Sequence, residues 1–316
     1  MGQLEDGVWR AVPRKPSAKG EFVRIDAQMR NWIRADGSSD FPPEAGRYHL
    51  YVSYACPWAH RTLIYRAIKG LQDVIGFSVV SPLMLENGWE FTEYPGATGD
   101  RVNGFTYSHQ LYTTANPRYS GRSSVPVLWD TQGRTIVSNE SSEIIRMLNS
   151  EFDAFAKPGD YYPEELRAEI DAVNTRVYET VNNGVYRSGF AVKQDAYEEA
   201  VHALFDSLDW LEERLSRSRY LVGDRITEAD WRLFPTLIRF DHVYHGHFKC
   251  NIRRLVDYPN LFAWTRELYQ WPGVAETVNM DHIRTHYYAS HENVNPTRIV
   301  SVGPDIDFGA PHGRGN

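Results

Sequence analysis

The chain has 316 residues, 42% of them hydrophobic and 24% charged, which suits a globular protein of two domains at about 150 residues each. The formal net charge of -7, from 34 Lys and Arg against 41 Asp and Glu, offers no general attraction to nucleic-acid backbones or anionic lipid. No stretch approaches the roughly 18 to 20 apolar residues that a membrane-spanning helix needs. We therefore expect no nucleic-acid partner and no membrane partner.

The two cysteines, Cys56 and Cys250, are too few and too far apart for a disulfide-stapled exported domain. The N-terminal segment carries acidic residues and no apolar signal region, and Asp6 stands where a myristoylation signal needs Ser or Thr. These features favour a reducing compartment, and we expect the protein to be cytoplasmic.

Residues 1–45 form an N-terminal extension rich in Gly, Pro and charge, for which no fold is predicted. After it, RYHLYVSYA has the alternating and aromatic residues of a strand, and CPWAHRTLIYRAIKGL carries apolar residues at helical spacing. The run VIGFSVV (74–80) is short and β-branched and indicates the next strand. The order predicts a βαβ unit with a parallel crossover.

Residues 82–123 have no strong period and indicate a functional insertion. The runs VPVLWD (125–130) and TIVSN (135–139), joined by TQGR, predict a β-hairpin, and ESSEIIRMLN predicts the helix that follows. A βαβ unit followed by ββα is the order of a thioredoxin-like domain, and we place this α/β domain at 46–155.

Pro, Gly and acidic residues interrupt the periodicity at 156–165 and predict a domain boundary. Beyond it, apolar residues from Val201 to Leu215 step by three and four and form one wide stripe of a long helix. We expect an all-α domain at 160–290 and a polar C-terminal tail at 291–316. The pair Thr227 and Asp230 has the Thr-x-x-Asp spacing of a helix N-terminus, which indicates folding rather than chemistry.

Cys56 lies at the junction between a predicted strand and a predicted helix, and Pro57 after it suits the first helical turn. Helix N–H groups and the positive end of the helix dipole favour the thiolate form, so Cys56 is a candidate nucleophile. Ala59 occupies the place of the second cysteine of a C-x-x-C motif, so the second thiol must come from another molecule. The alternative is that Cys56 is only a small buried residue. It is less favoured, because Cys56 follows a predicted strand and ligands bind at the carboxyl edge of open α/β sheets.

Val125 and Pro126 begin the predicted hairpin. In a thioredoxin-type fold such a proline is cis, and Val125 holds an extended tripeptide by β-like hydrogen bonds. The alternative is an ordinary proline at the end of a strand.

The sequence Asn139-Glu140-Ser141 begins the helix after the hairpin. Its N–H groups suit a ligand carboxylate, and the Glu140 side chain suits a ligand ammonium, which together describe a site for an α-amino acid head group. The alternative is helix capping by Ser138 or Asn139, and the two roles are compatible.

Five segments, in order, resemble the glutathionyl-hydroquinone reductases, the Xi class of glutathione transferases: YVSYACPWAHRTLIYRAIKGL, SVPVLWD, SNESSEIIRMLN, ITEADWRLFPTLIRFDHVYHGHFKCN and YPNLFAWTRELYQWPGV. The resemblance spans about residues 30 to 290. It implies a thioredoxin-like N-terminal domain, an all-α helical-bundle C-terminal domain and a homodimer. It also implies an enzyme that uses glutathione to reduce glutathionyl-hydroquinones to hydroquinones.

The resemblance extends to individual positions. Cys56 matches the family's catalytic thiol, which forms a mixed disulfide with glutathione before a second glutathione releases it as oxidised glutathione. Five residues match positions that contact glutathione: Val125, Glu140 and Ser141, with Trp89 and Arg122 on the glycyl and cysteinyl side. Three tyrosines match those lining the quinol pocket, where one orients or protonates the quinol: Tyr186, Tyr244 and Tyr287. Glutathione is then a co-substrate, and no tightly bound cofactor is expected.

Other interpretations remain open. An omega-like thioltransferase or dehydroascorbate reductase would share Cys56 and differ in the second pocket, and such side activities are expected. A conventional transferase would activate glutathione through the hydroxyl of Ser53 or Tyr54, and a non-catalytic scaffold would need no thiol at all.

A metal site is a further alternative, because four residues of zinc-compatible type lie close together: His242, His245, His247 and Cys250. Their spacing matches no common zinc motif, and we expect no metal.

Overall fold

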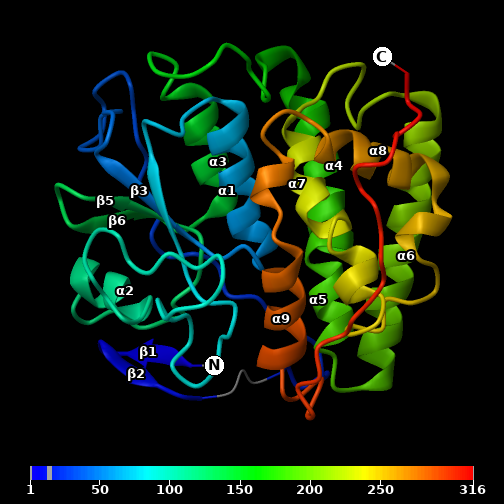
Figure 1. The fold of residues 1–316 in the computed structure, drawn as a ribbon, viewed down its shortest axis with the longest axis horizontal. Coiled ribbons are helices and arrows are strands. Elements are labelled where there is room, and N and C mark those ends of the chain that lie inside the picture. The colour runs from blue at the N-terminus through cyan, green and yellow to red at the C-terminus, as the bar shows by residue number, and fades with distance from the viewer. Residues whose placement is uncertain (1, 13–15, 316) are drawn as a thin grey trace. The chain divides into compact units, whose positions relative to one another are not determined.

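The structure, a computed structural model, describes residues 2–12 and 16–315 and forms two compact units (Figure 1). The sheet unit consists of residues 2–12, 26–159 and 276–290. The helical unit consists of residues 16–25, 160–275 and 291–315. The units therefore interleave along the chain, whereas the expected boundaries were contiguous, and residues 276–290 group with the sheet.

The sheet unit is built on four strands in the order β4-β3-β5-β6. The strands are β3 (Tyr48–Val52), β4 (Gly76–Val79), β5 (Val127–Asp130) and β6 (Thr135–Ser138). β3 pairs with β4 in parallel, and β5 is antiparallel to both β3 and β6. The predicted βαβ unit and the predicted hairpin are both present.

Helices α1 (Pro57–Ile68) and α3 (Ser141–Ser150) lie side by side against the sheet (Figure 1). Their apolar residues are buried between helix and sheet, including Leu63, Ile64, Ile144, Ile145 and Leu148. Burying one such side chain contributes about 1.5–3 kcal/mol, so this layer holds α1, and with it the strand-to-helix turn before it, in place.

The insertion at 82–123 contains one helix, α2 (His109–Ala115), and otherwise irregular chain. Asp100 organises part of it, because its carboxylate accepts hydrogen bonds from the Tyr51 hydroxyl and from the backbone N–H groups of 102, 103 and 105. The N-terminal extension adds a small hairpin, β1 (Gln3–Glu5) and β2 (Val8–Arg10), which the sequence did not predict.

The helical unit confirms the predicted α bundle. Its helices are α4 (Arg167–Val177), α5 (Gly184–Gly189), α6 (Gln194–Arg217), α7 (Glu228–Leu237) and α8 (Pro259–Tyr269). Short 3-10 segments lie at Glu164–Leu166 and Leu255–Asp257, and π turns at Tyr178–Asn182 and Phe240–Tyr244. A further 3-10 segment, Ala275–Thr277, begins at the last residue of this unit and continues into the sheet unit. The apolar stripe of α6 is buried from Val201 to Leu215 as predicted. Helix α9 (Met280–Ser290) belongs to the sheet unit.

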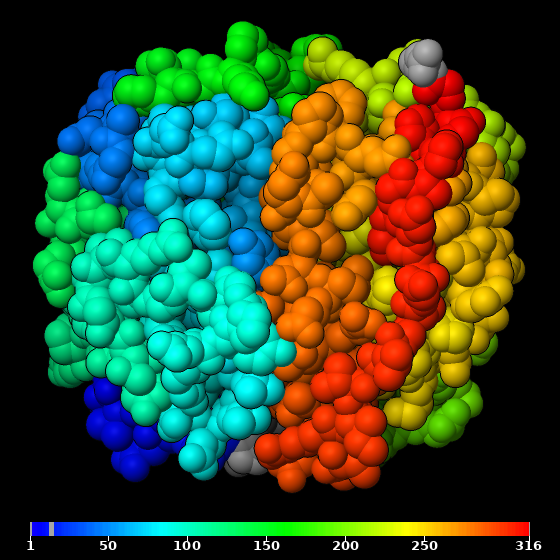
Figure 2. All heavy atoms as spheres, viewed as in Figure 1, coloured from blue at the N-terminus to red at the C-terminus, as the bar shows by residue number. Residues whose placement is uncertain are grey.

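The C-terminal segment is ordered on the helical unit and runs across its helices (Figures 1 and 2). The buried Glu267 of α8 accepts hydrogen bonds from Arg314 at 2.6 Å and from Arg219 at 2.9 Å. Gln270 donates to the carbonyls of Phe308 and Ala310. The Phe308 ring is buried against Tyr269 and two further rings, so apolar burial and ion pairing both hold the tail.

The predicted N-terminal motif of α7 is a capping box. The buried Asp230 carboxylate accepts from the backbone N–H of Thr227 at 2.9 Å, from that of Leu221 at 3.0 Å, and from Trp264 Nε1 at 3.0 Å. Three donors from three separate segments therefore depend on one carboxylate.

Replacing Asp230 with Ala should lower the free energy of unfolding by about 3–5 kcal/mol, because three buried donors lose their acceptor. Urea denaturation of both proteins measures this change. The control is Asp257→Ala, since Asp257 makes similar local contacts with Arg254 at an exposed position. Equal small losses for the two variants would contradict the role of Asp230.

His49 of β3 is a buried imidazole inside the sheet unit. Its Nε2 lies 2.8 Å from Ser78 Oγ of β4, and Gly76 leaves space for the ring, since a Cβ there would lie 2.7 Å from Nδ1. Burial lowers the pKa of His49 to about 4. The unfolded chain therefore takes up a proton at higher pH than the folded chain, and stability falls as the pH drops from about 6.5 toward 4.

From pH 7 to pH 5 the wild type should lose about 2 kcal/mol more unfolding free energy than His49→Gln, which cannot be protonated. Urea denaturation at the two pH values gives both losses. His202→Gln, at an exposed position of α6, is the control and should follow the wild type. A wild-type loss no larger than that of His49→Gln would be inconsistent with a neutral buried imidazole.

Candidate active site

Cys56 is the N-cap residue of α1, in extended conformation (φ -78°, ψ 118°), and Pro57 is the first helical residue, as predicted. Its carbonyl accepts from the His60 N–H at 2.9 Å, the first hydrogen bond of the helix. The thiol is partly exposed and donates to the Val125 carbonyl at 3.4 Å. The sulfur therefore lies at the positive end of the helix and at the surface of the unit.

The Val125–Pro126 peptide bond is cis, as predicted. Val125 lies outside the β3–β5 ladder, whose last pair is Tyr51 with Val127. Its backbone is thus placed beside Cys56 and continues the direction of β5, which is the arrangement that an extended peptide needs to add β-like hydrogen bonds.

Glu140 is the N-cap of α3, so neither Ser138 nor Asn139, the caps of the alternative interpretation, is the capping residue. Its carboxylate accepts from the Ser142 N–H at 2.9 Å and from the Ser142 hydroxyl at 2.8 Å. Ser141, the first residue of α3, is buried, and its hydroxyl accepts from Arg61 at 3.4 Å. A carboxylate and a helix N-terminus thus lie together, which suits an α-amino acid head group.

A hydrogen-bond network that the sequence did not reveal joins the insertion to both of these segments. The buried Tyr112 hydroxyl of α2 donates to the Ser124 carbonyl at 2.8 Å and accepts from the Asn139 amide at 3.0 Å. The Asn139 amide also donates to the Ser124 hydroxyl at 3.2 Å. The residues just before Val125 and Glu140 are therefore fixed relative to each other by one buried tyrosine.

Trp89 and Arg122 both come from the insertion. The Trp89 ring is buried and stacks on His286 of α9, with ring centroids 4.7 Å apart. His286 is held in turn by a 2.9 Å contact between its Nδ1 and the Pro82 carbonyl. Arg122 donates from Nη1 to the Gly2 carbonyl at 2.7 Å, and its Nε is buried without a hydrogen-bond partner among the described residues. Burial lowers the pKa of the Arg122 guanidinium.

The three candidate tyrosines fall in different units. Tyr186 and Tyr244 lie together in the helical unit, with ring centroids 6.1 Å apart, and Phe248 packs against both rings. Tyr287 is buried in α9 of the sheet unit. The structure thus brings Tyr186 and Tyr244 together, and a pocket shared by all three remains a prediction.

The histidine-rich segment makes contacts other than metal ligation. His247 lies with its Nε2 3.4 Å from His291 Nδ1, and burial lowers the pKa of His247 to about 4. Cys250 is fully buried, and burial raises the pKa of its thiol to about 12. Within residues 2–12 and 16–315 no group of three or more His, Cys, Asp or Glu side chains could hold a metal ion.

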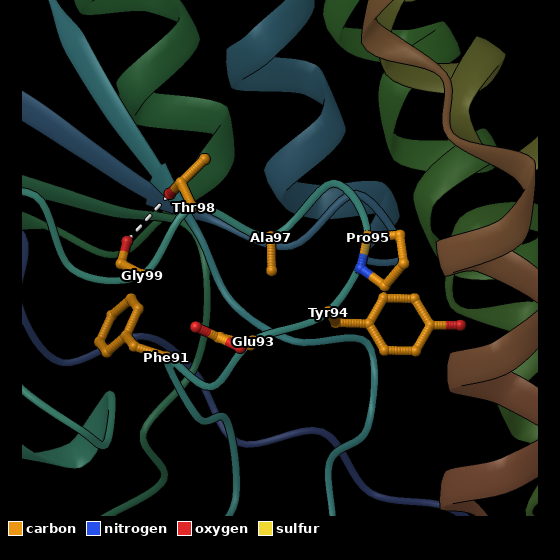
Figure 3. A pocket seen from close by; sticks show the side chains of 7 residues that line it. All are labelled: Phe91, Glu93, Tyr94, Pro95, Ala97, Thr98 and Gly99. Carbon is orange, nitrogen blue, oxygen red and sulfur yellow. Dashed lines mark hydrogen bonds between the residues drawn. The ribbon is translucent and has the colours of Figure 1, made fainter.

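One cavity lies within the insertion, with a volume of about 640 Å³ (Figure 3). Its lining runs from Phe91 to Gly99 and includes none of the candidate site residues. Tyr94 points from it toward α9 and donates to Asp281 at 3.0 Å. The cavity is therefore a surface feature of the insertion, separate from the thiol.

No described helix is long and apolar enough to cross a membrane.

Comparison with known proteins identifies the family. The glutathione S-transferase N-terminal domain model matches residues 55–151, and the C-terminal domain model matches residues 194–267. The chain is 56% identical to glutathionyl-hydroquinone reductase YqjG of Escherichia coli over 99% of its own length and 98% of the relative. It is 57% identical to glutathionyl-hydroquinone reductase PcpF of Sphingobium chlorophenolicum over 96% of both chains.

Two solved structures agree. The glutathione-bound structure of YqjG superposes with a TM-score of 0.92 at 55% identity and 99% coverage of both chains. The Xi class glutathione transferase of Natrialba magadii gives a TM-score of 0.94 at 50% identity, covering 99% of this chain and 97% of that one. This chain belongs to the Xi class of glutathione transferases. Membership confirms the predicted thioredoxin-like and helical-bundle architecture of a glutathione transferase.

Within this Xi glutathione transferase, the two thiols should differ sharply in reactivity. We expect iodoacetamide to label Cys56 and to leave Cys250 unlabelled, because Cys56 is partly exposed at a helix N-terminus and Cys250 is fully buried. Peptide mapping by mass spectrometry locates the label, and Cys56→Ser is the control that should take up none. Equal labelling of Cys56 and Cys250 would contradict the expected difference between the two thiols.

Proposed function

We propose that this protein is a glutathionyl-hydroquinone reductase that works through a mixed disulfide between Cys56 and glutathione. The observation that carries the proposal is the thiol at the N-cap of α1, 3.4 Å from the carbonyl that precedes the cis-proline. The names of the relatives YqjG and PcpF support the same substrate class.

The first step is attack by the Cys56 thiolate on the sulfur of the glutathionyl-hydroquinone. A Cys56–glutathione S–S bond forms and the aryl C–S bond breaks, and its electron pair goes to the ring carbon, which takes up a proton. The hydroquinone leaves. The ring is thereby reduced by two electrons, and the two sulfurs are oxidised to the disulfide.

The second step returns the enzyme to its starting state. The thiolate of a second glutathione attacks the glutathionyl sulfur of the mixed disulfide, which releases oxidised glutathione and the Cys56 thiolate. The monothiol sequence requires this external thiol, because Ala59 occupies the place of a second cysteine.

The tripeptide site follows from the residues around the thiol. Val125 lies next to Cys56 and is suited to pair with the cysteinyl backbone, and Glu140 with Ser141 suits the γ-glutamyl head group. Trp89 and Arg122 complete the site on the glycyl side. Glutathione serves as co-substrate, and the reaction needs no tightly bound cofactor.

The aromatic cluster of the helical unit suits the quinol. Tyr186 and Tyr244 present two phenol groups among phenylalanine rings, which fits a flat ligand with hydroxyl groups. We propose that one of these tyrosines, or Tyr287, orients the quinol or supplies the proton to the ring carbon. The protein acts as a cytoplasmic homodimer. Its side activity is that of a thioltransferase or a dehydroascorbate reductase.

The alternative of hydroxyl-activated conjugation receives little support at Ser53. The Ser53 side chain is fully buried, and its hydroxyl accepts a hydrogen bond from the Ala55 N–H. The Ser53 backbone carbonyl accepts from the Cys56 N–H. Ser53 therefore helps to shape the turn that presents the thiol.

Cys56→Ser should lose hydroquinone release from a glutathionyl-hydroquinone plus glutathione by a factor of at least about 100, because serine cannot form the disulfide. The same variant should gain conjugation of chlorodinitrobenzene, since a hydroxyl can assist a bound glutathione thiolate. Chromatography of the quinol product measures the first rate and absorbance the second.

The control is Ser216→Ala, at an exposed position near the C-terminal end of α6, which should retain the wild-type rate of hydroquinone release. Undiminished hydroquinone release by Cys56→Ser would end the reductase assignment. Conjugation by the wild type that survives loss of Cys56 unchanged would favour the hydroxyl mechanism instead.

A further inference from the structure

We propose that the N-terminal hairpin β1–β2 is a positioning element of the glutathione site, which holds Arg122 where the glycyl carboxylate of glutathione binds. The inference rests on the proposed function, because Arg122 is a glutathione residue only if the chain binds glutathione. Figure 1 shows the hairpin beside α2 at the edge of the sheet unit.

The hairpin binds the segment that leads into Arg122 through its backbone. Leu4 and Gly121 exchange two hydrogen bonds, of 2.8 and 2.9 Å, and the Gly7 N–H donates to the Tyr119 carbonyl at 3.0 Å. The Asp6 N–H donates to the Ser120 hydroxyl at 2.9 Å. β1 therefore acts as a strand partner for residues 119–121, directly before Arg122.

Its second strand binds the other side of the insertion. Trp9 Nε1 donates to the Glu86 carbonyl at 3.0 Å, and the Trp9 ring stacks on His109 of α2 with centroids 4.6 Å apart. A Cβ at Gly88 would lie 2.9 Å from the Trp9 ring, so the glycine leaves room for it. The hairpin thus joins residues 86–88, next to Trp89, to the segment before Arg122.

The last contact is to Arg122 itself. The Gly2 carbonyl accepts from Arg122 Nη1 at 2.7 Å, while Arg122 Nε is buried and has no hydrogen-bond partner among the described residues. No carboxylate of the described chain forms an ion pair with Arg122. A half-buried guanidinium with one neutral partner and an unused donor suits a ligand carboxylate, which would supply the missing charge and hydrogen bond.

The contact between the hairpin and the segment before Arg122 can be tested at Gly7, where replacement by alanine is a small chemical change. Its φ is +79°, and a Cβ there would lie 1.9 Å from the Pro117 carbonyl oxygen. Gly37 has the same backbone torsion, φ +77°, but a Cβ there would have no atom within 4 Å. Gly7→Ala and Gly37→Ala therefore share the conformational cost of a left-handed alanine, and only Gly7→Ala displaces the hairpin.

The experiment measures the dissociation constants of glutathione and of its glycyl monoethyl ester for the full chain by titration calorimetry. The ester has the same backbone and lacks the glycyl charge. For Gly7→Ala we expect glutathione to bind about 10-fold more weakly and the ester to bind as in the wild type, because a displaced guanidinium loses its charge-assisted hydrogen bond to the glycyl carboxylate. Gly37→Ala should match the wild type with both ligands, and Arg122→Met should show the same selective loss as Gly7→Ala.

Equal weakening of both ligands by Gly7→Ala, or no weakening of either, would overturn the inference, since a merely structural hairpin cannot select for the glycyl charge. If Gly7→Ala does not fold, Trp9→Leu loosens the same hairpin without changing a backbone torsion and is held to the same outcomes. A wild type that binds no glutathione would overturn the proposed function as well. If the wild type binds glutathione and is catalytically active, and Gly7→Ala does not differ from it, only the proposed role of the hairpin is overturned.

Discussion

The chemistry of this protein depends on the register between β3 and β5. Tyr51 of β3 pairs with Val127 of β5, so the chain that leaves β3 toward Cys56 and the chain that enters β5 from Val125 meet at one end of the ladder. The contact between the Cys56 thiol and the Val125 carbonyl, at 3.4 Å, is a direct result. Every residue of both strands is buried, so each side chain is closely packed against its own neighbours, and the packing cost of a shift of one residue fixes the register.

Strands and helices whose apolar residues recur at a regular spacing could be predicted from the sequence. Residues at the ends of these elements could be placed with them. β3, α1, β4 and the β5–β6 hairpin have the expected order because apolar residues recur at spacings of two or of three and four. Cys56 was therefore placed correctly at a strand-to-helix turn. The sequence does not predict the hairpin β1–β2, because strands of three residues carry no readable period and the residue that bridges to Leu4 of β1, Gly121, lies far along the chain.

The roles of the remaining candidate site residues could not be predicted from the sequence by physical reasoning alone. The Glu140 cap departs from the usual preference for Ser or Asn, since Ser138 instead accepts from the Glu140 N–H, and the Asn139 amide is engaged by Tyr112. Tyr112 itself has no signal in the sequence, because a buried hydroxyl acquires its role only from the backbone groups that folding brings to it. Trp89 and Arg122 lie in a segment without a period, so only the family resemblance singled them out.

Charged groups in the described chain differ in how completely their partners satisfy them. Glu267 is buried with two arginines and a tyrosine, and Arg47 pairs with the buried Asp130. Such pairs offset the desolvation of both members within the protein. Arg122 has a single carbonyl for a partner. Keeping a half-buried cation without an anion costs stability, and in the role proposed for Arg122 a bound glycyl carboxylate would recover that energy as binding free energy.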